Sequence, residues 1–537
     1  MIFNSIEFFV FLPIVYFCYL LLNHRGQNIW LLLASYLFYG WWDPRFLSLI
    51  AISTAVDFYC GILIDNHKLK KKDIASSVTY LFAMMVICLW LLGDGGSMLI
   101  LGLIAAAIVG VLAILSNRLF VLEQTQRKKI VLAVSMCVNL GLLATFKYFN
   151  FFIDSAEALL MDLGMSQSSL THLDIVLPVG ISFYTFQTMS YSIDIYRGKL
   201  KPTHKFIDFA LFVSYFPQLV AGPIERATNL LPRIIEKRKV SWEQSAEGLG
   251  LIAYGLFKKV VIADGLSASV ASIYGTSGAV STLDVIIATL FFTVQIYCDF
   301  SGYSDIARGV SKLLGIDLMR NFRFPYFSRN PSEFWRRWHI SLSSWLRDYL
   351  YISLGGNRKG TVSMYRNLML TMVLGGLWHG AAWNFVLWGA YQGGLLVFYR
   401  LVSEPLLRVM PLANRLSSLY WVLSLIVFFI FTCYGWLLFR AESFGQIAQF
   451  TGLLLSGIDT FNFTIEIPPF SALAGLPILI AYELKGYWLE SKGHDGIAIA
   501  QLSTKALLVR SGLYGLMLLV FVGALSAPPA DFIYFQF

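Results

Sequence analysis

Long apolar segments follow one another along the whole chain, separated by short polar stretches. Several have close to the ~20 residues that a helix needs to cross a bilayer, and others are shorter or broken by glycine. Short or broken segments are typical of re-entrant helices surrounded by protein or water rather than lipid. The pattern therefore predicts an all-α integral membrane protein, with apolar segments at 6–22, 28–42, 46–64, 77–93, 98–116, 130–152, 175–193, 247–265, 282–300, 367–400 (in one or two pieces), 418–439, 470–486 and 511–528.

Composition supports this class. Hydrophobic residues make up 57% of the 537 residues and charged residues only 14%, whereas a soluble domain carries about 25% charged residues. The formal net charge is +9, but no basic domain stands apart from the apolar segments, so nucleic acid is not expected as a partner. The six cysteines form no CxxC or Cys/His pattern, and we predict neither a disulfide framework nor a metal site.

Loop charges predict an orientation. Basic loops lie at 67–72 and 118–129, and since two predicted spans separate them, both are expected on the cytoplasmic side. The N-terminus is then outside, and the first apolar run is read as a retained helix, not a cleaved signal. The segment 153–174, which has four acids and no Lys or Arg, is also outside. The stretch 207–222 has basic residues on both sides and is expected to dip in and return.

One segment, 303–366, differs from the rest in its charge. It holds eleven Lys and Arg against four acids, together with several Trp and Tyr. A basic, aromatic segment can rest on anionic lipid as an interfacial helix. It can equally form a docking surface for a phosphorylated donor, because Arg and Lys bind phosphate. Composition alone leaves both interpretations open.

Two of the seven histidines stand among aromatic residues and glycines. His379 follows Gly375, Gly376 and Trp378 in an apolar segment. An ionisable group there is costly unless it is paired or faces water, so it is a candidate functional residue. The alternative is an interhelical hydrogen bond without catalytic meaning.

His339 lies in a segment that opens with Pro331, Ser332 and Glu333, which suits a helix start. If the helix continues to Ser343, then Trp335, Arg336 and Ser343 are the neighbours of His339 at three and four residues. That face would carry a titratable ring, an aromatic wall, a cation and a hydroxyl. The alternative is a structural imidazole at the membrane interface.

Two such histidines suit acyl transfer from a thioester to a hydroxyl. The hydroxyl needs a base during attack, and neutral imidazole titrates near the working pH. The oxyanion that forms needs hydrogen-bond donors, which the second imidazole, Asn384 or indole N–H groups could provide. If the donor is an acyl-CoA, its phosphates would need basic residues. The predicted catalytic residues are His379 and His339, and the predicted donor-binding residues are Arg336, Arg337, Arg347, Trp335, Trp338 and Asn384.

Asp299 and Asp305 lie at the predicted cytoplasmic end of one span. Two nearby acids in a membrane segment could form a cation or proton path, as in a transporter. Helix capping and pairing with the many arginines is the simpler interpretation, which we favour.

The order of several long motifs resembles the bacterial branch of the membrane-bound O-acyltransferase (MBOAT) family that acetylates alginate. The motifs are LPVGISFYTFQTMSYSIDIYRG (177–198), FPQLVAGPIER (216–226), QIYCDFSGYSDIARG (295–309), FWRRWHISLSSWLRDYLYISLGGNRKG (334–360), GGLWHGAAWNFVLWGAYQG (375–393) and the ending FIYFQF (532–537). Ser353 stands where the family often has Pro, and Cys298 where an aromatic residue is common. Neither position is expected to carry chemistry.

This resemblance implies a fold and a function. The fold is a ring of roughly 11 to 13 transmembrane helices, with re-entrant helices and a central tunnel. It is one polytopic domain, with N-terminal helices at 1–152, the MBOAT core with both histidines at 153–400 and C-terminal helices at 401–537. In the family His379 is the usual catalytic residue, and His339 is the second characteristic histidine.

The implied activity is O-acetylation of an exopolysaccharide such as alginate, across a bacterial inner membrane. The donor is cytoplasmic, acetyl-CoA is the expected one, and no bound cofactor is implied. A periplasmic acetyltransferase partner, the polysaccharide acceptor and membrane lipid are the expected partners. The alternatives are D-alanyl or other acyl transfer to a cell-wall polymer, or a non-enzymatic polysaccharide export component.

Overall fold

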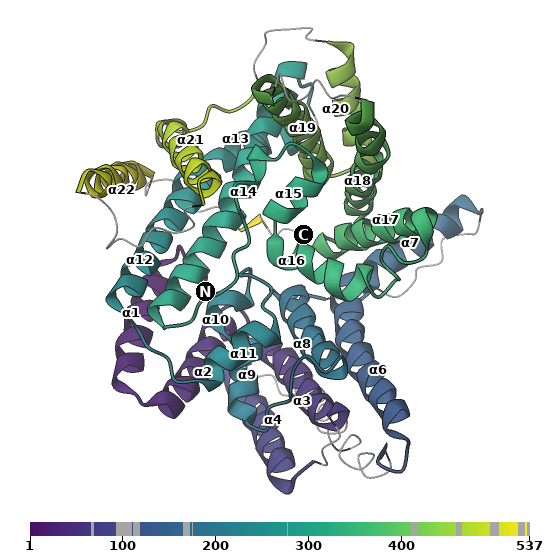
Figure 1. Cartoon of the computed structure of the whole chain (residues 1–537), viewed down its shortest axis with the longest axis vertical. Helices are drawn as coiled ribbons and strands as arrows, with labels where there is room; N and C mark the ends of the chain where they lie inside the picture. Colours follow the sequence, from purple (N-terminus) through teal and green to yellow (C-terminus); the bar gives the residue numbers. More distant parts are fainter. Residues whose placement is uncertain are drawn as a thin grey trace. The chain divides into compact units, whose positions relative to one another are not determined.

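The computed structural model describes most of the chain (Figure 1), namely residues 1–65, 69–92, 110, 119–164, 172–173, 175–276, 278–409, 417–457, 464–493, 504–524 and 532–533. Some of the sequence predictions fall elsewhere. All of the span predicted at 98–116 except Gly110, and also His67, Arg118, Asp174, His494 and the end of the chain from residue 534, lie outside the described residues.

Every regular element of the described chain is a helix, as the hydrophobic pattern predicts. The chain divides into two compact units, one formed by Met1–Ser241 with Val310–Leu318 and the other by Trp242–Gly309 with Met319–Phe537. The division predicted from the sequence, with boundaries at residues 152 and 400, stays a prediction.

The first unit is built around α3, whose residues are almost all buried. Helices α4, α6, α8 and α9 pack against it. The carboxylate of Asp57 on α3 accepts hydrogen bonds from Ser135, Asn139 and Ser192, and such polar contacts join helices that have little hydrophobic drive to associate in lipid. The elements of this unit are α1 (Ile6–Leu21), α2 (His24–Gly40), η1 (Pro44–Phe46), α3 (Leu47–Ile64), α4 (Lys71–Leu92), α6 (Gln124–Leu143), η2 (Ala144–Tyr148), α7 (Phe149–Asp162), α8 (Ile181–Tyr196), α9 (Phe206–Ser214), α10 (Phe216–Leu219) and α11 (Ala227–Ile235).

The second unit contains both candidate histidines. Its longest helix, α14, continues beyond the unit to Leu313. Two stretches of this unit, η3 and η5, are π-helical, as is η2 of the first unit, and this rare geometry is frequent at functional sites. The elements here are α12 (Trp242–Leu256), η3 (Phe257–Ala263), α13 (Asp264–Tyr274), α14 (Thr282–Leu313), η4 (Pro325–Phe327), α15 (Pro331–Arg337), α16 (Ile340–Trp345), η5 (Leu346–Tyr351), α17 (Gly360–His379), α18 (Trp383–Val409), α19 (Ser417–Arg440), α20 (Phe444–Ser456), α21 (Phe470–Ser491) and α22 (Thr504–Ala524).

Five helical stretches of the described chain are long and apolar enough to cross a membrane, and Ile6–Leu21 and Tyr514–Ala524 are shorter apolar helices. The larger number of spans and the central tunnel stay predictions. The membrane-length stretches are Pro44–Ile64, Gln124–Asp162, Thr282–Leu313, Trp383–Val402 and Leu419–Arg440.

Two predicted interruptions of the apolar segments are present. The stretch 207–222 forms α9 and the short α10, separated at Tyr215. The stretch 367–400 forms two helices, since α17 ends at His379 and α18 begins at Trp383. The second break places His379 at a helix end, where its side chain meets residues from several helices.

Candidate active site

Glycines bring α17 and α18 into direct backbone contact beside His379. A Cβ atom on Gly376 would clash with the carbonyl oxygen of Phe385, and one on Gly389 would lie 2.5 Å from the carbonyl oxygen of Met372. Only residues without a side chain allow two helices this close, as is common in membrane bundles. Gly380, directly after His379, leaves room for the ring of Phe385. The glycines therefore allow α17 and α18 to pack closely beside the end of α17.

His379 is 5% exposed and stands in a wall of aromatic rings. Its ring centroid lies 5.1 Å from that of Trp378, 5.2 Å from that of Trp388 and 5.5 Å from that of Phe439, each edge-to-face. Trp388 comes from α18 and Phe439 from α19, so three helices define the position of one imidazole. Such edge-to-face pairs are the preferred geometry of aromatic rings.

His339 does not lie within a helix, and the prediction of a continuous helix from Pro331 to Ser343 is wrong. Helix α15 starts at Pro331 as predicted, with the Asn330 side chain accepting from the Glu333 amide, but it ends at Arg337. His339 has φ +41° and ψ +54° and precedes α16. The three- and four-residue spacing that would join its ring to Trp335 and Arg336 is therefore lost.

The cause of this break is a neighbouring segment of backbone. The Arg323 amide donates to the Arg337 carbonyl and the Ile340 amide donates to the Asn321 carbonyl, both at 2.9 Å. Residues 321–323 thus take backbone hydrogen bonds that a continuous helix would make internally. The local sequence favours a helix, and a contact from elsewhere in the chain overrides it.

The break brings the two histidines together. His339 is completely buried, and its ring centroid lies 6.4 Å from that of His379, with Trp378 at 5.9 Å and Phe300 at 4.6 Å. His339 is outside the five membrane-length helices, and its burial lowers the pKa of the imidazole, so the ring is neutral near pH 7. The pair forms one site in the second unit.

The residues near the histidines that could donate to an oxyanion differ in whether their N–H groups are already hydrogen-bonded. The Asn384 amide donates to the carbonyls of Ala441, at 3.0 Å, and Phe439, at 3.5 Å, which joins α18 to the end of α19. In contrast, the buried indole N–H groups of Trp335 and Trp388 have no hydrogen-bond partner within the described part of the chain. A buried donor without a hydrogen bond destabilises the fold, so such groups are uncommon in native proteins and often have a function.

Trp338, which was predicted to bind the acyl donor, is packed among other aromatic rings. It is 1% exposed, stacks on Phe334 with an interplanar angle of 12° and lies 4.7 Å from Trp436, centroid to centroid. This environment is that of a core residue. Its contribution to the site is to hold α15 in place next to His339.

The three predicted arginines separate into different environments. Arg336 is exposed, and no carboxylate in the described residues forms an ion pair with it. Arg337 pairs with Glu333 at 3.3 Å and Glu490 at 3.2 Å. Arg347 pairs with Asp348 at 2.7 Å but remains 65% exposed. Arg336 is thus the most available cation of the three.

Asp299 and Asp305 lie within α14, not at its ends, so helix capping is not their role. The carboxylate of Asp305 is 2.7 Å from the buried ammonium of Lys258, and Arg308 adds a longer contact of 3.4 Å. Lys259 lies 2.8 Å from both Asp299 and Asp264. The partners are thus mainly lysines, where arginines were expected. The sequence spacing could not predict these pairs, because Lys258 and Lys259 belong to η3 and the two aspartates belong to α14.

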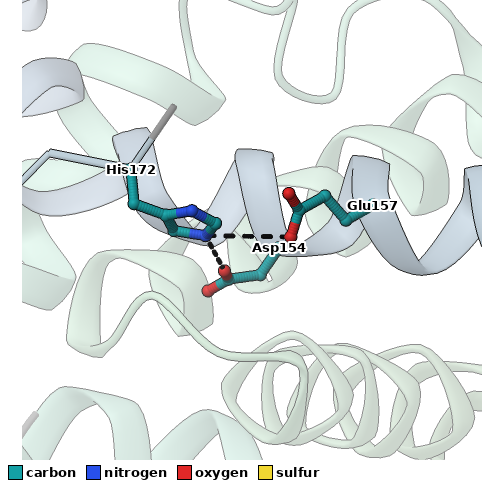
Figure 2. Close-up of side chains that lie close together, drawn as sticks. All are labelled: Asp154, Glu157 and His172. Carbon is teal, nitrogen blue, oxygen red and sulfur yellow. Dashed lines mark hydrogen bonds and ion pairs between the residues drawn. The ribbon is translucent and has the colours of Figure 1, made fainter. Parts of the chain in front are cut away.

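A further polar group lies in the first unit (Figure 2). His172 Nε2 is 2.7 Å from a carboxylate oxygen of Asp154 and 3.9 Å from one of Glu157. The Asn150 side chain donates to the Leu173 carbonyl and accepts from its amide, which holds this segment on α7. One imidazole and two carboxylates could act as ligands of a metal ion. Because His172 and Asp154 are largely exposed, the ion pair itself is an adequate account of the group.

Helices long and apolar enough to cross a membrane contribute residues around two buried imidazoles, which is the arrangement of a membrane protein. The model of the membrane-bound O-acyltransferase family matches residues 201–441, a range that includes both histidines. The chain is 37% identical over 483 residues to a probable alginate O-acetylase AlgI of Pseudomonas putida, covering 90% of this chain and 86% of the relative. This protein therefore belongs to the membrane-bound O-acyltransferase family and is an O-acyltransferase.

Two other similar proteins have names that state different acyl acceptors. A peptidoglycan O-acetyltransferase of Helicobacter pylori is 31% identical over 507 residues, covering 88% of this chain and 83% of the relative. A teichoic acid D-alanyltransferase of Bacillus subtilis is 28% identical over 289 residues, covering 50% of this chain and 69% of the relative. The acyl acceptors that these names state are all polymers of the cell envelope or exopolysaccharides.

Proposed function

We propose that this protein transfers an acetyl group from cytoplasmic acetyl-CoA through the membrane, for O-acetylation of an exopolysaccharide such as alginate. The observation that carries the proposal is the pair of buried imidazoles, His339 and His379, whose centroids are 6.4 Å apart among aromatic rings. The names of the alginate and peptidoglycan relatives support acetyl as the group and a polysaccharide as the acceptor.

His379 is the proposed general base. A ring nitrogen accepts the proton of the acceptor hydroxyl while the hydroxyl oxygen attacks the thioester carbonyl carbon. The carbonyl becomes a tetrahedral oxyanion, which collapses as the C–S bond breaks. The proton then passes from the imidazolium to the departing thiolate, so that one ester and one thiol are formed. His379 ends α17, and its ring there meets side chains of α18 and α19, which suits a base that is held in one position.

The oxyanion would be stabilised by indole N–H groups. Trp388 is in edge-to-face contact with His379 and with Trp335, and both indoles have a buried donor without a partner among the described residues. Donors aimed at developing charge in a dry site contribute strongly to catalysis. Asn384 is a weaker candidate, since its amide already donates to two carbonyls. His339, neutral and buried, would complete the electrostatic environment of the reacting carbonyl.

Acetyl-CoA carries phosphates, and the basic surface of α15 and η5 is the proposed place for them. Arg336 and Arg347 are its exposed cations. Arginine binds phosphate through two parallel N–H donors, which gives both affinity and orientation. Arg337 would support them indirectly, because its own donors hold Glu333 and Glu490.

The remaining features of the proposal concern location and partners. We infer a multi-pass protein of the bacterial inner membrane, with a tunnel that brings the cytoplasmic donor to an extracytoplasmic acceptor. A periplasmic acetyltransferase would receive the acetyl group and modify the polymer. The apolar outer surfaces of helices such as α19 are suited to contact lipid.

Two alternatives have less support. D-alanyl transfer rests on relatives such as the Bacillus subtilis protein, which matches only half of this chain. Transport was suggested by Asp299 and Asp305, but both carboxylates are neutralised by buried lysines at 2.7–2.8 Å. A cation path would require carboxylates that can release such partners.

The test is acetyl transfer by purified protein in lipid nanodiscs, with acetyl-CoA labelled in the acetyl group and a short acceptor oligosaccharide, with and without a periplasmic extract. We expect His379→Gln to lower the rate of label transfer about 10²- to 10⁴-fold, the usual contribution of a general base. His204→Gln is the control, since His204 lies outside the site, 3.5 Å from Asp73. Full transfer by His379→Gln would refute the mechanism.

A further inference from the structure

The backbone of His339 is in a conformation that side-chain-bearing residues avoid. Its φ of +41° and ψ of +54° lie in the left-handed region, and only Phe324 shares a positive φ among the described residues other than glycine. Such a residue persists only where its surroundings determine it, and it is often found at functional sites. The hydrogen bonds around His339 indicate which residue holds this conformation.

Asn321 makes three hydrogen bonds around this position. Its carbonyl accepts from the Ile340 amide at 2.9 Å, its side-chain oxygen accepts from the Ser341 hydroxyl at 2.6 Å, and its side-chain N–H₂ donates to the Ser304 hydroxyl at 3.0 Å. Asn321 is 1% exposed, and both serines are also buried. The two residues that follow His339 are therefore tied, through one side chain and its carbonyl, to α14.

The same helix supplies a wall for the imidazole. Phe300 precedes Ser304 by one turn of α14, and residues four apart lie on one helix face. The Phe300 ring is edge-to-face with His339 at 4.6 Å. One face of α14 thus holds the backbone after His339, by way of Asn321, and contacts the ring of His339 directly.

We propose that Asn321 is a positioning residue that holds His339 in its left-handed conformation and so keeps its ring opposite His379. The inference rests on the proposed function only for its catalytic consequence. Without the Asn321 side chain, Ser341 and Ser304 lose their shared partner, and residues 338–340 can relax toward the helix that their sequence favours. The imidazole would then leave the position in which it faces His379, since that position depends on the break between α15 and α16.

The first experiment measures the local structure, not the activity. Hydrogen–deuterium exchange of the full-length protein in nanodiscs should show faster exchange of the peptide covering 338–345 in Asn321→Ala, by at least tenfold. Ser341→Ala, which removes one of the two side-chain contacts, should give a smaller increase. Unchanged exchange in this peptide would overturn the proposal, whatever the activity of the protein.

The second experiment measures catalysis. We expect Asn321→Ala to lower kcat for acetyl transfer about 10- to 100-fold while KM for acetyl-CoA changes less than about twofold, because small displacements of a catalytic group cost rate more than binding. The matched control is Asn139→Ala in the first unit, another buried asparagine whose side chain joins helices through Asp57, Ser53 and Thr188.

The outcomes separate the two proposals. If Asn139→Ala loses as much kcat as Asn321→Ala at equal loss of thermal stability, Asn321 is structural only and the proposal fails. If Asn321→Ala opens the 338–345 peptide while kcat remains intact, the catalytic part fails and so does the role of His339. Should Asn321→Ala prevent folding, Ser304→Ala and Ser341→Ala are tested in the same two measurements, and a normal kcat and normal exchange in both overturn the proposal.

Discussion

The imidazole of His339 lies 6.4 Å, centroid to centroid, from that of His379, although neither residue is helical neighbour to the other. One residue lies in the break between α15 and α16, and the other ends α17. Both breaks are needed for the two rings to meet, so the site depends on where helices stop as much as on where they run.

The left-handed backbone conformation of His339 should reverse the usual order of stability of glycine and alanine variants. Replacing a residue by glycine normally destabilises more than replacing it by alanine, but here glycine fits the positive φ without strain. His339→Gly should therefore be more stable than His339→Ala by about 1 kcal/mol, although both lose the same ring. Thermal unfolding in one detergent compares them, and a less stable glycine variant would show that φ at 339 relaxes.

The contact of α17 with α18 should not tolerate a single added methyl group. Gly376→Ala would place a Cβ against the carbonyl of Phe385, and backbone cannot move aside cheaply. We expect loss of folded protein in membranes and of acetyl transfer. Gly394→Ala on α18, the other helix of the pair, is the control, because no atom of the described residues lies within 4 Å of its Cβ position. That change should be neutral or stabilising by up to about 1 kcal/mol.

The indole N–H of Trp388 can be removed while most of its ring is kept. If this group stabilises the oxyanion, Trp388→Phe should lower kcat about 10²- to 10³-fold, the usual effect of losing one such donor. Trp436→Phe is the matched control, because Trp436 is 2% exposed, compared with 1% for Trp388, and packs on Trp388. Equal losses in kcat would assign both residues to packing.

Neighbouring arginines on α15 should differ in their effect. Arg336→Ala is expected to raise KM for acetyl-CoA about tenfold with little change in thermal stability, as one charge-assisted hydrogen bond is lost. Arg337→Ala should instead lower thermal stability, because Glu333 and Glu490 lose their shared cation. A donor KM unaffected by Arg336→Ala would remove this surface from the binding site.

Lys259 should be important for stability because it neutralises two buried carboxylates. Lys259→Met leaves Asp264 and Asp299 close to each other without a cation, and breaking a buried pair typically costs about 3–5 kcal/mol. The double variant Lys259→Met/Asp299→Asn should recover part of this loss. Arg45→Met, in a pair with Asp43 that is half exposed on the arginine side, is the control and should matter little.

The hydrophobic pattern predicted several apolar helices of this protein within a few residues. The predicted segments 46–64 and 418–439 correspond to α3, Leu47–Ile64, and α19, Ser417–Arg440. Both are long, uniformly apolar and bounded by polar residues, so the local sequence is sufficient to define them. The glycines around His379 indicated that the segment 367–400 could be broken, but the sequence left open whether it forms one helix or two.

The sequence failed where distant segments compete with local preference. Residues 331–343 favour a helix, but hydrogen bonds from 321–323 interrupt it at His339. Likewise, Asp299 and Asp305 were expected to pair with arginines. Arg308 does contact Asp305 at 3.4 Å, but Lys258 and Lys259 on η3 make the closer contacts, at 2.7 and 2.8 Å. Partner choice across helices depends on which faces meet, and no spacing along one helix contains that information.

By itself, then, the sequence determined the all-helical membrane class, the positions of the apolar helices and the two histidines, because burial in lipid and glycine-mediated helix breaks are properties of short segments. Only the tertiary structure decided that His339 is not helical and stands at 6.4 Å from His379, that Asn384 is engaged by carbonyls while two indole N–H groups are not, and that Asn321 ties the site to α14. These are relations between segments far apart in the chain, and the physical reason is that hydrogen bonds and ring contacts form only after the helices have packed.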